Sequence, residues 1–246
     1  MAPNLIGEMA AIIASENDMF LEITAVSDTS EEEFKQIKKQ TGNIEVRIHA
    51  SIVGFDTGNR EAETQNKKIF ATAQKAADIF KAATIVVHSG YGHGQKYLEE
   101  TARQFRMFHD ERIVAENLPY YDNNGDHLHG ATAEEIAYIM HESGCGFCFD
   151  FSHAICAALS LNMDIETQLK SFYALKPMVY HMCDGNINLA KDMHLHFGAG
   201  NFPLPHFLQD YTAKDAYITM ETGNGLERFN DLRIKDYQYL KSILQS

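Results

Sequence analysis

The chain has 246 residues, of which 45% are hydrophobic and 22% are charged, and its formal net charge is -13. This composition is that of an ordinary globular protein, and the length suits a single α/β domain spanning residues 1–246. The negative charge excludes non-specific binding of nucleic acid through a broad basic face. No apolar run is long enough to cross a membrane and no secretion signal opens the sequence, so we expect a cytoplasmic protein.

The predicted strands and helices alternate along the chain. Short β-branched or apolar runs predict seven strands, at 20–26, 44–50, 84–90, 112–118, 146–152, 177–183 and 216–222. Segments of helical period predict helices at 31–39, 62–82, 95–108, 132–143 and 226–244. In the fourth of these helices, Thr132 as the N-cap with Glu135 three residues on gives a capping-box pattern.

This alternation indicates parallel strands joined by right-handed crossovers. An open doubly wound sheet and a closed (β/α)8 TIM barrel both fit the pattern. No glycine-rich phosphate loop follows the first strand, which weakens the case for a nucleotide-binding open sheet. The spacing of the polar residues described below favours the barrel. Only seven strands are visible, so we expect the first barrel strand to be missing or truncated. Residues 2–6 (APNLI) are a candidate stub, and the IGEMAAIIAS that follows looks helical.

The four cysteines include a C-x-x-C pair, Cys145 and Cys148. Such a pair can be redox-active or can form half of a zinc site. No second C-x-x-C exists, and this one sits in a strand-like segment, GCGFCFDF. We therefore expect small buried thiols in a reducing compartment.

Histidines and carboxylates recur at the ends of the predicted strands. They are His49, His88, Glu116, Asp150, His181 and Glu221, with His153 just beyond Asp150. Barrel enzymes carry their chemistry at this end of the strands, so we expect one shared site. Asp192 and His194, two residues apart in the next loop, would point the same way in an extended chain. These residue types are the usual ligands of catalytic zinc and manganese.

Two further histidines are candidate substrate-binding residues. His93 lies in the glycine-rich segment SGYGHG, a few residues after His88. His196 lies two residues after His194. Both are close enough in sequence to the predicted metal site to touch a bound substrate, although a structural role also fits His196.

Six segments resemble those of endonuclease IV, within the xylose isomerase-like TIM barrel superfamily: VVHSG, IVAENLP, CFDFSHAICAA, YHMCDGN, DMHLHFGAGN and ITMETGN. The resemblance implies up to three zinc ions, with manganese as an alternative metal. By resemblance, His49, His88 and Glu116 bind the first ion. Glu116, Asp150, His181 and Glu221 bind the second, and His153, Asp192 and His194 bind the third.

The resemblance also implies an activity. It predicts a phosphoester hydrolase of the AP endonuclease type, acting in DNA repair on DNA with an abasic site. Hydroxide formed at the metals would attack the phosphate, and Glu116 would orient it.

Two other readings stay open. A sugar or sugar-phosphate isomerase or epimerase would use one divalent metal, with Glu116 and Glu221 passing a proton between neighbouring carbons. The segment after His49 lacks the tyrosine expected near the site, and the region after His88 is shortened, which favours this small substrate over DNA. A barrel that keeps metal only for stability or partner binding is the third reading.

Overall fold

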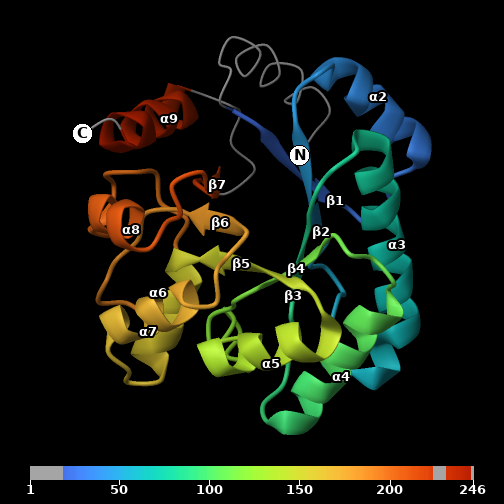
Figure 1. Cartoon of the computed structure of the whole chain (residues 1–246), viewed down its shortest axis with the longest axis horizontal. Helices are drawn as coiled ribbons and strands as arrows, with labels where there is room; N and C mark the ends of the chain where they lie inside the picture. The colour runs from blue at the N-terminus through green and yellow to red at the C-terminus, as the bar shows by residue number, and fades with distance from the viewer. Residues whose placement is uncertain (1–18, 224–230, 245–246) are drawn as a thin grey trace.

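The computed structural model describes residues 19–223 and 231–244, in which strands and helices alternate (Figure 1). The strands are β1 (Leu21–Ala25), β2 (Val46–Ala50), β3 (Ile85–His88), β4 (Ile113–Glu116), β5 (Gly146–Asp150), β6 (Val179–Met182) and β7 (Tyr217–Met220). The helices are α2 (Glu31–Thr41), η1 (Arg60–Ala62, a 3-10 turn), α3 (Glu63–Phe80), α4 (Gln95–Met107), α5 (Ala133–Ser143), α6 (Phe151–Ser160), α7 (Ile165–Tyr173), α8 (Leu204–Asp210) and α9 (Asp231–Leu244).

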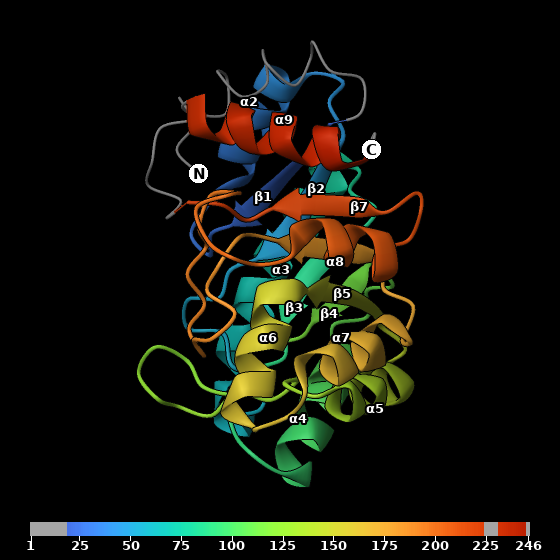
Figure 2. The ribbon, with the colours of Figure 1, turned by 90° about the vertical axis from the view of Figure 1, so that its left-hand side faces the viewer.

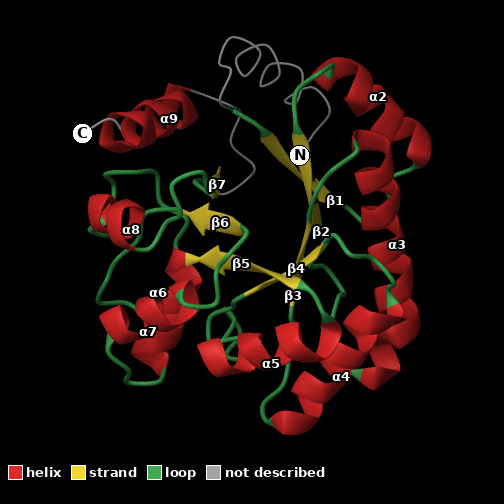
Figure 3. Cartoon of the chain, viewed as in Figure 1, coloured by secondary structure: helices red, strands yellow, loops and turns green. Residues whose placement is uncertain are grey.

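All seven strands pair in chain order and all pairs are parallel. The sheet curves into a nearly closed barrel with the helices outside it (Figure 3). In Figure 2 the strands run toward the left of the view, and the long loops after β4 and β6 gather on that side. The predicted barrel architecture is confirmed, with seven strands in the described residues.

Side chains bridge the gap between the two edge strands, β1 and β7. The ring of Tyr217 lies 5.7 Å from that of Phe20, and the Arg47 guanidinium lies 3.5 Å from the Tyr217 ring centre. Deeper in the barrel, Thr219 donates a hydrogen bond to Glu22 over 3.1 Å. The predicted stub at residues 2–6 lies outside the described residues, as does the helix-like segment after it.

Each strand buries alternate residues on opposite faces, as the period of two requires. In β4, Ile113 and Ala115 belong to the hydrophobic core between sheet and helices, while Val114 and Glu116 point into the barrel. Val114 joins a small apolar cluster of the barrel interior, whose other members are Val86, Cys148 and Val179. This buried apolar cluster, the apolar floor of the site, lies directly below the polar residues at the strand ends.

Three helices, α6, α7 and α8, occupy segments for which no helix was predicted, and the strand predicted at 146–152 ends at Asp150. Helix α6 follows β5 with no loop, because the Asp150 side chain accepts the His153 N–H over 2.6 Å and caps the helix. Nearly every residue of α6 is buried, so its sequence shows no polar face that would indicate a helix. The predicted helix at 226–244 is seen as α9, and its first residues lie outside the described ones.

Two other features bear on the expectations from sequence. Cys148, Cys156 and Cys183 are buried free thiols and Cys145 is partly buried, as the composition predicted. Burial raises the pKa of the Cys148 thiol, which keeps it protonated and unreactive. Among the described residues, no helix combines the length and the apolar character needed to cross a membrane.

Candidate metal centre

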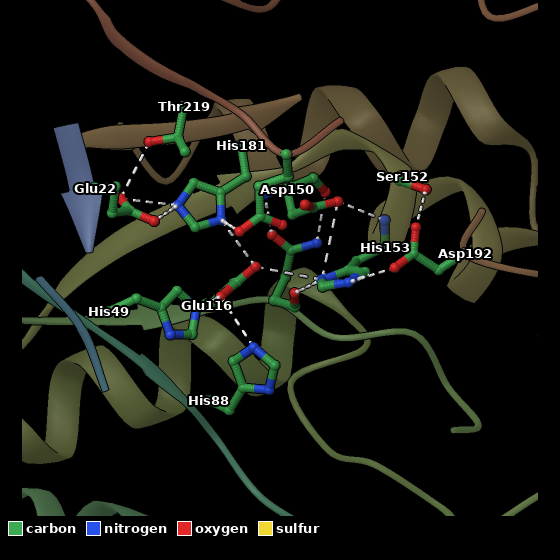
Figure 4. Close-up of polar contacts among 12 residues, drawn as sticks. Glu22, His49, His88, Glu116, Asp150, Ser152, His153, His181, Asp192 and Thr219 are labelled. Carbon is green, nitrogen blue, oxygen red and sulfur yellow. Dashed lines mark hydrogen bonds and ion pairs between the residues drawn. The ribbon is translucent and has the colours of Figure 1, made fainter. Parts of the chain in front are cut away.

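The polar residues predicted at the strand ends lie together at one mouth of the barrel (Figure 4). His49 and His181 are the last residues but one of β2 and β6; His88, Glu116 and Asp150 end β3, β4 and β5; and Glu221 directly follows β7. The parallel strands bring these ends to the same mouth of the barrel. His88 pairs with Glu116 and Asp150 with His181, while Glu116 pairs with Cys148, two residues before Asp150.

Glu116 lies at the centre of the cluster and is completely buried. Its Oε2 atom lies 3.1 Å from His49 Nε2 and 3.2 Å from His88 Nε2. Its Oε1 atom lies 3.1 Å from His181 Nδ1 and 3.4 Å from His153 Nδ1. The two oxygens of one carboxylate therefore face two different pairs of histidines.

A second group lies beside this centre, on α6 and on the loop after β6. Asp192 Oδ2 lies 3.3 Å from His153 Nε2 and 2.5 Å from His194 Nε2, and Ser152 donates a hydrogen bond to Asp192 Oδ1 over 2.7 Å. His194 has a φ of 47°. The expected extended geometry is thus wrong at this residue, because its φ lies in the left-handed region, which is rare outside glycine. The two side chains nevertheless meet, as expected.

Four sets of side chains have ligand atoms within 4.8 Å of one another and could hold a metal ion. They are His49, His88 and Glu116; Glu116, Asp150, His181 and Glu221; His153, Asp192 and His194; and His49, His181 and Glu221. The first three are the sets expected from the sequence. Their nitrogen and oxygen donors suit zinc or manganese.

Asp150 gives independent support for a cation-binding role of this cluster. Its Oδ2 atom is buried and has no hydrogen-bond partner among the described residues. Burial and the charges of Glu116 and Asp192 raise the pKa of Asp150 to about 7, although His153 opposes this. A buried carboxylate oxygen without a partner is costly, and a cation at this point would remove the cost.

Four of the site histidines, His49, His153, His181 and His194, favour the protonated form beside the carboxylates, whereas burial lowers the pKa of His88. Burial lowers the pKa of His49, but the hydrogen bond and the charge of Glu116 outweigh it and raise that pKa to about 9. Burial likewise opposes protonation of His194, and Asp192 raises its pKa to about 9. Burial raises the pKa of Glu116 itself, but the charges of His181 and His88 hold it well below its usual range. Metal ions would replace these protons.

Backbone carbonyls fix the ring orientation of three of the histidines. The Nδ1 atoms of His49, His153 and His194 lie 2.7 Å, 2.9 Å and 2.7 Å from the carbonyl oxygens of Ala50, Asn117 and Glu221. A carbonyl can only accept, so each Nδ1 carries a proton in the neutral ring and Nε2 presents its lone pair. That lone pair faces Glu116 or Asp192.

The two histidines predicted to bind substrate lie outside the four sets. His93, in the loop after β3, lies 6.0 Å from the Tyr120 ring and 5.3 Å from the His127 ring. His196 Nδ1 lies 2.7 Å from Asp236 Oδ2 on α9.

Sequence reasoning missed a buried acid beside this cluster, Glu22 of β1. Its carboxylate lies 3.2 Å from His181 Nε2 and its side chain is 5% exposed. The signal was present, because Leu21, Ile23 and Ala25 are apolar and leave Glu22 on the inward face. The prediction considered only residues at the ends of strands, and Glu22 is the second residue of its strand.

The fold and the cluster define a parallel (β/α) barrel whose strand ends gather donor atoms for metal ions. A family model described as Xylose isomerase-like TIM barrel matches residues 12–232, so the chain belongs to that family. The "Probable endonuclease 4" of Mycobacterium ulcerans (strain Agy99) is 26% identical over 212 residues, which cover 82% of this chain and 79% of the relative.

Two solved structures share the fold. Endonuclease IV from Thermus thermophilus superposes with a TM-score of 0.71 at 20% identity, covering 98% of this chain and 94% of the other. A D-tagatose 3-epimerase-like protein gives a TM-score of 0.71 at 16% identity, covering 92% of this chain and 97% of the other. The same barrel thus occurs in a protein named as an endonuclease and in one named as epimerase-like, and identities this low show a shared fold alone.

Proposed function

We propose that this chain is a metal-dependent phosphoester hydrolase that acts on DNA at abasic sites. The observation that carries the proposal is the set of nine donor residues in three groups, with Glu116 shared between two of them. A single-metal reaction has no use for the group of His153, Asp192 and His194. The curated relatives named endonuclease 4 support the same choice.

Divalent ions bound there would neutralise phosphate charge and make hydroxide available near neutral pH. The chain's own part is to hold this arrangement rigidly. Glu116 fixes the spacing of the first two groups, because its two oxygens face His49 and His88 on one side and His181 on the other. It would also orient the attacking water, and the apolar floor below closes the inner end of the site.

The loops after β3 and β4 supply a surface for a ring-bearing substrate. They are joined by backbone pairing of Tyr91 with Leu128. On them, Tyr120, Tyr121 and His127 form a cluster with ring centres 4.5–4.8 Å apart, and Tyr121 is 43% exposed. Partly exposed aromatic faces stack on unpaired bases and sugars, so we assign this cluster and His93 to binding the nucleotide beside the abasic site.

A sugar isomerase or epimerase is the second candidate. The set of Glu116, Asp150, His181 and Glu221 resembles a single-metal site, and the two glutamates face His181 Nδ1 over 3.1 Å and 3.3 Å. Two carboxylates near one metal could pass a proton between adjacent carbons of a sugar. The fold shared with a D-tagatose 3-epimerase-like protein is compatible with this reading.

The deciding experiment is an incision assay on a duplex with one synthetic abasic site, using protein reconstituted with zinc or manganese. The proposal expects a cut on the 5′ side of the abasic residue and none in the matched intact duplex. No cleavage by the fully metal-loaded protein would reject DNA as the substrate. Turnover of a ketose or aldose by the same preparation would support the second candidate instead.

A further inference from the structure

The imidazole ring of His181 is turned the opposite way from the rings of His49, His153 and His194. In His49, His153 and His194, Nδ1 bonds to a backbone carbonyl and Nε2 faces the site. In His181, Nδ1 faces the site, 3.1 Å from Glu116 and 3.3 Å from Glu221, and Nε2 points the other way. The partner of this Nε2 is the Glu22 carboxylate, at 3.2 Å and 3.3 Å from its two oxygens.

Glu22 lies deeper in the barrel than the predicted ligands. Thr24, two residues after Glu22 in β1, is the register partner of His49. Glu22 therefore lies on the inward face of β1, two residues further from the barrel mouth than His49. It belongs to none of the four sets that could hold a metal ion. Figure 4 shows its carboxylate beside the imidazole edge that faces away from Glu116. Glu22 therefore faces His181 and leaves the metal centre to other residues.

A neutral imidazole that donates from Nε2 must present a lone pair at Nδ1. We propose that Glu22 is a positioning residue that accepts the Nε2–H of His181 and so directs Nδ1 to the metal held with Glu116, Asp150 and Glu221. The carboxylate does for His181 what a backbone carbonyl does for His49, His153 and His194. A carboxylate partner also makes the ligating nitrogen more basic, which strengthens its bond to a metal.

The hydrogen bond from Thr219 fixes Glu22 in turn. Thr219 Oγ1 donates to Glu22 Oε2 over 3.1 Å, and this bond crosses the gap between β7 and β1. The carboxylate therefore connects the unpaired edges of the barrel to a metal ligand. A purely structural role for Glu22 would affect the fold through this bond and would leave the chemistry of His181 unchanged. The two roles can be separated by measuring metal binding and stability together.

The test compares Glu22→Gln with Thr219→Val and with Glu32→Gln, an exposed charge-matched control on α2. Zinc affinity is measured by competition with a chelator, and the melting temperature of each metal-free protein is measured in parallel. Loss of a carboxylate partner of a metal-bound histidine typically lowers metal affinity by about 10–100-fold. We expect that loss for one site in Glu22→Gln, a smaller loss in Thr219→Val, and unchanged affinity in Glu32→Gln.

A second readout needs no variant and so does not depend on the folding of one. Nitrogen NMR of the histidine rings in the zinc-loaded protein distinguishes a metal-bound Nδ1 from a metal-bound Nε2. The inference expects His181 to carry its proton on Nε2 and zinc on Nδ1. Zinc on Nε2 of His181 would overturn it.

The inference rests on the proposed metal centre, and the two can fail separately. Equal zinc affinity in the wild-type protein and Glu22→Gln would overturn the role of Glu22 and leave the metal centre standing. A lower melting temperature without a change in affinity would also overturn it, because Glu22 would then only close the barrel. Absence of zinc binding in the wild-type protein would remove both proposals.

Discussion

His181 Nδ1 lies 3.1 Å from Glu116 Oε1, although 65 residues separate the two in the chain. Both side chains are buried in full, and each is the inward-facing residue near the end of its strand. Two ionisable groups removed from water at this distance depend on each other, because loss of one leaves the other buried and unpaired. The pair lies at the middle of the proposed metal centre, where the Glu116 carboxylate faces four histidines.

Replacing the shared carboxylate should disable the whole centre. In Glu116→Gln, His49, His88 and His181 lose their common anionic neighbour. We expect at least two bound ions to be lost and the rate of incision to fall by about a thousandfold, comparable to the loss of a principal electrostatic group in other active sites. Metal analysis and single-turnover kinetics measure both. If this variant kept its full metal content, Glu116 would not be a ligand shared by two metal ions, and the prediction would be wrong.

The third group separates the two candidate functions. His194→Ala removes one donor from the set of His153, Asp192 and His194 and leaves Glu116 and Glu221 in place. The hydrolase account expects the variant to hold one ion fewer and to cut abasic DNA at least about 10–100-fold more slowly. A single-metal isomerase would keep its rate on a sugar. His206→Ala, at a histidine of α8 that bonds to Glu166 and Asp210, is the matched control and should behave as the wild type.

Zinc binding should release protons and strengthen as pH rises. His49 and His194 have pKa values of about 9 in the metal-free protein, because Glu116 and Asp192 outweigh the effect of burial. Both rings are therefore protonated near neutral pH and must lose a proton before they can bind metal. Titration with zinc in weak buffer should release protons near pH 7 and few above about pH 9. Affinity that stays constant across this range would contradict the described electrostatics.

The same groups fix the sign of the stability change in the metal-free protein. A pKa raised from 6.5 to about 9 means that the folded state binds the proton more tightly than the unfolded chain. The stabilisation is complete below the unfolded value of 6.5 and is lost as pH rises through about 9. The melting temperature of metal-free protein should fall over this window. With zinc bound, the melting temperature should not fall there, because metal takes the place of the protons.

The aromatic cluster on the loops after β3 and β4 should affect substrate binding more than chemistry. Tyr121→Ala removes an exposed ring that contacts Tyr120 and His127 and is not a member of the metal sets. Stacking of one base on an aromatic side chain contributes about 1–3 kcal/mol, so KM for abasic DNA should rise by about 5- to 100-fold with kcat nearly unchanged. Tyr239→Ala, on helix α9, serves as the control. A fall in kcat with KM unchanged would contradict a role for Tyr121 in substrate binding.

The sequence predicted the barrel and the gathering of the six donors at its strand ends because both depend on a simple repeat. Each βα unit returns the chain to the same end of the sheet, so His88, Glu116 and Asp150 each fall at the carboxyl end of a strand by spacing alone. What the repeat could not predict were contacts made across the barrel. Glu22 meets His181 only because the sheet curves until β1 approaches β6 and β7.

Local capping and loop conformation were also hidden from the sequence. Asp150 ends a strand and caps a helix with the same side chain, so the strand predicted at 146–152 runs two residues past its observed end. His194, which contacts Asp192, has a positive φ that no residue pattern indicates. Substrate choice depends on such loops, and therefore strand spacing carries less information about the substrate than about the metal site.

The central claim is that three groups of donors at the barrel mouth hold three divalent ions. Elemental analysis of zinc-reconstituted protein, combined with anomalous scattering from its crystals, counts and locates the ions in one measurement. The account predicts close to three zinc ions per chain: one between His49, His88 and Glu116, one at Asp150, His181 and Glu221, and one at His153, Asp192 and His194. A single ion, with the last group empty, would contradict it.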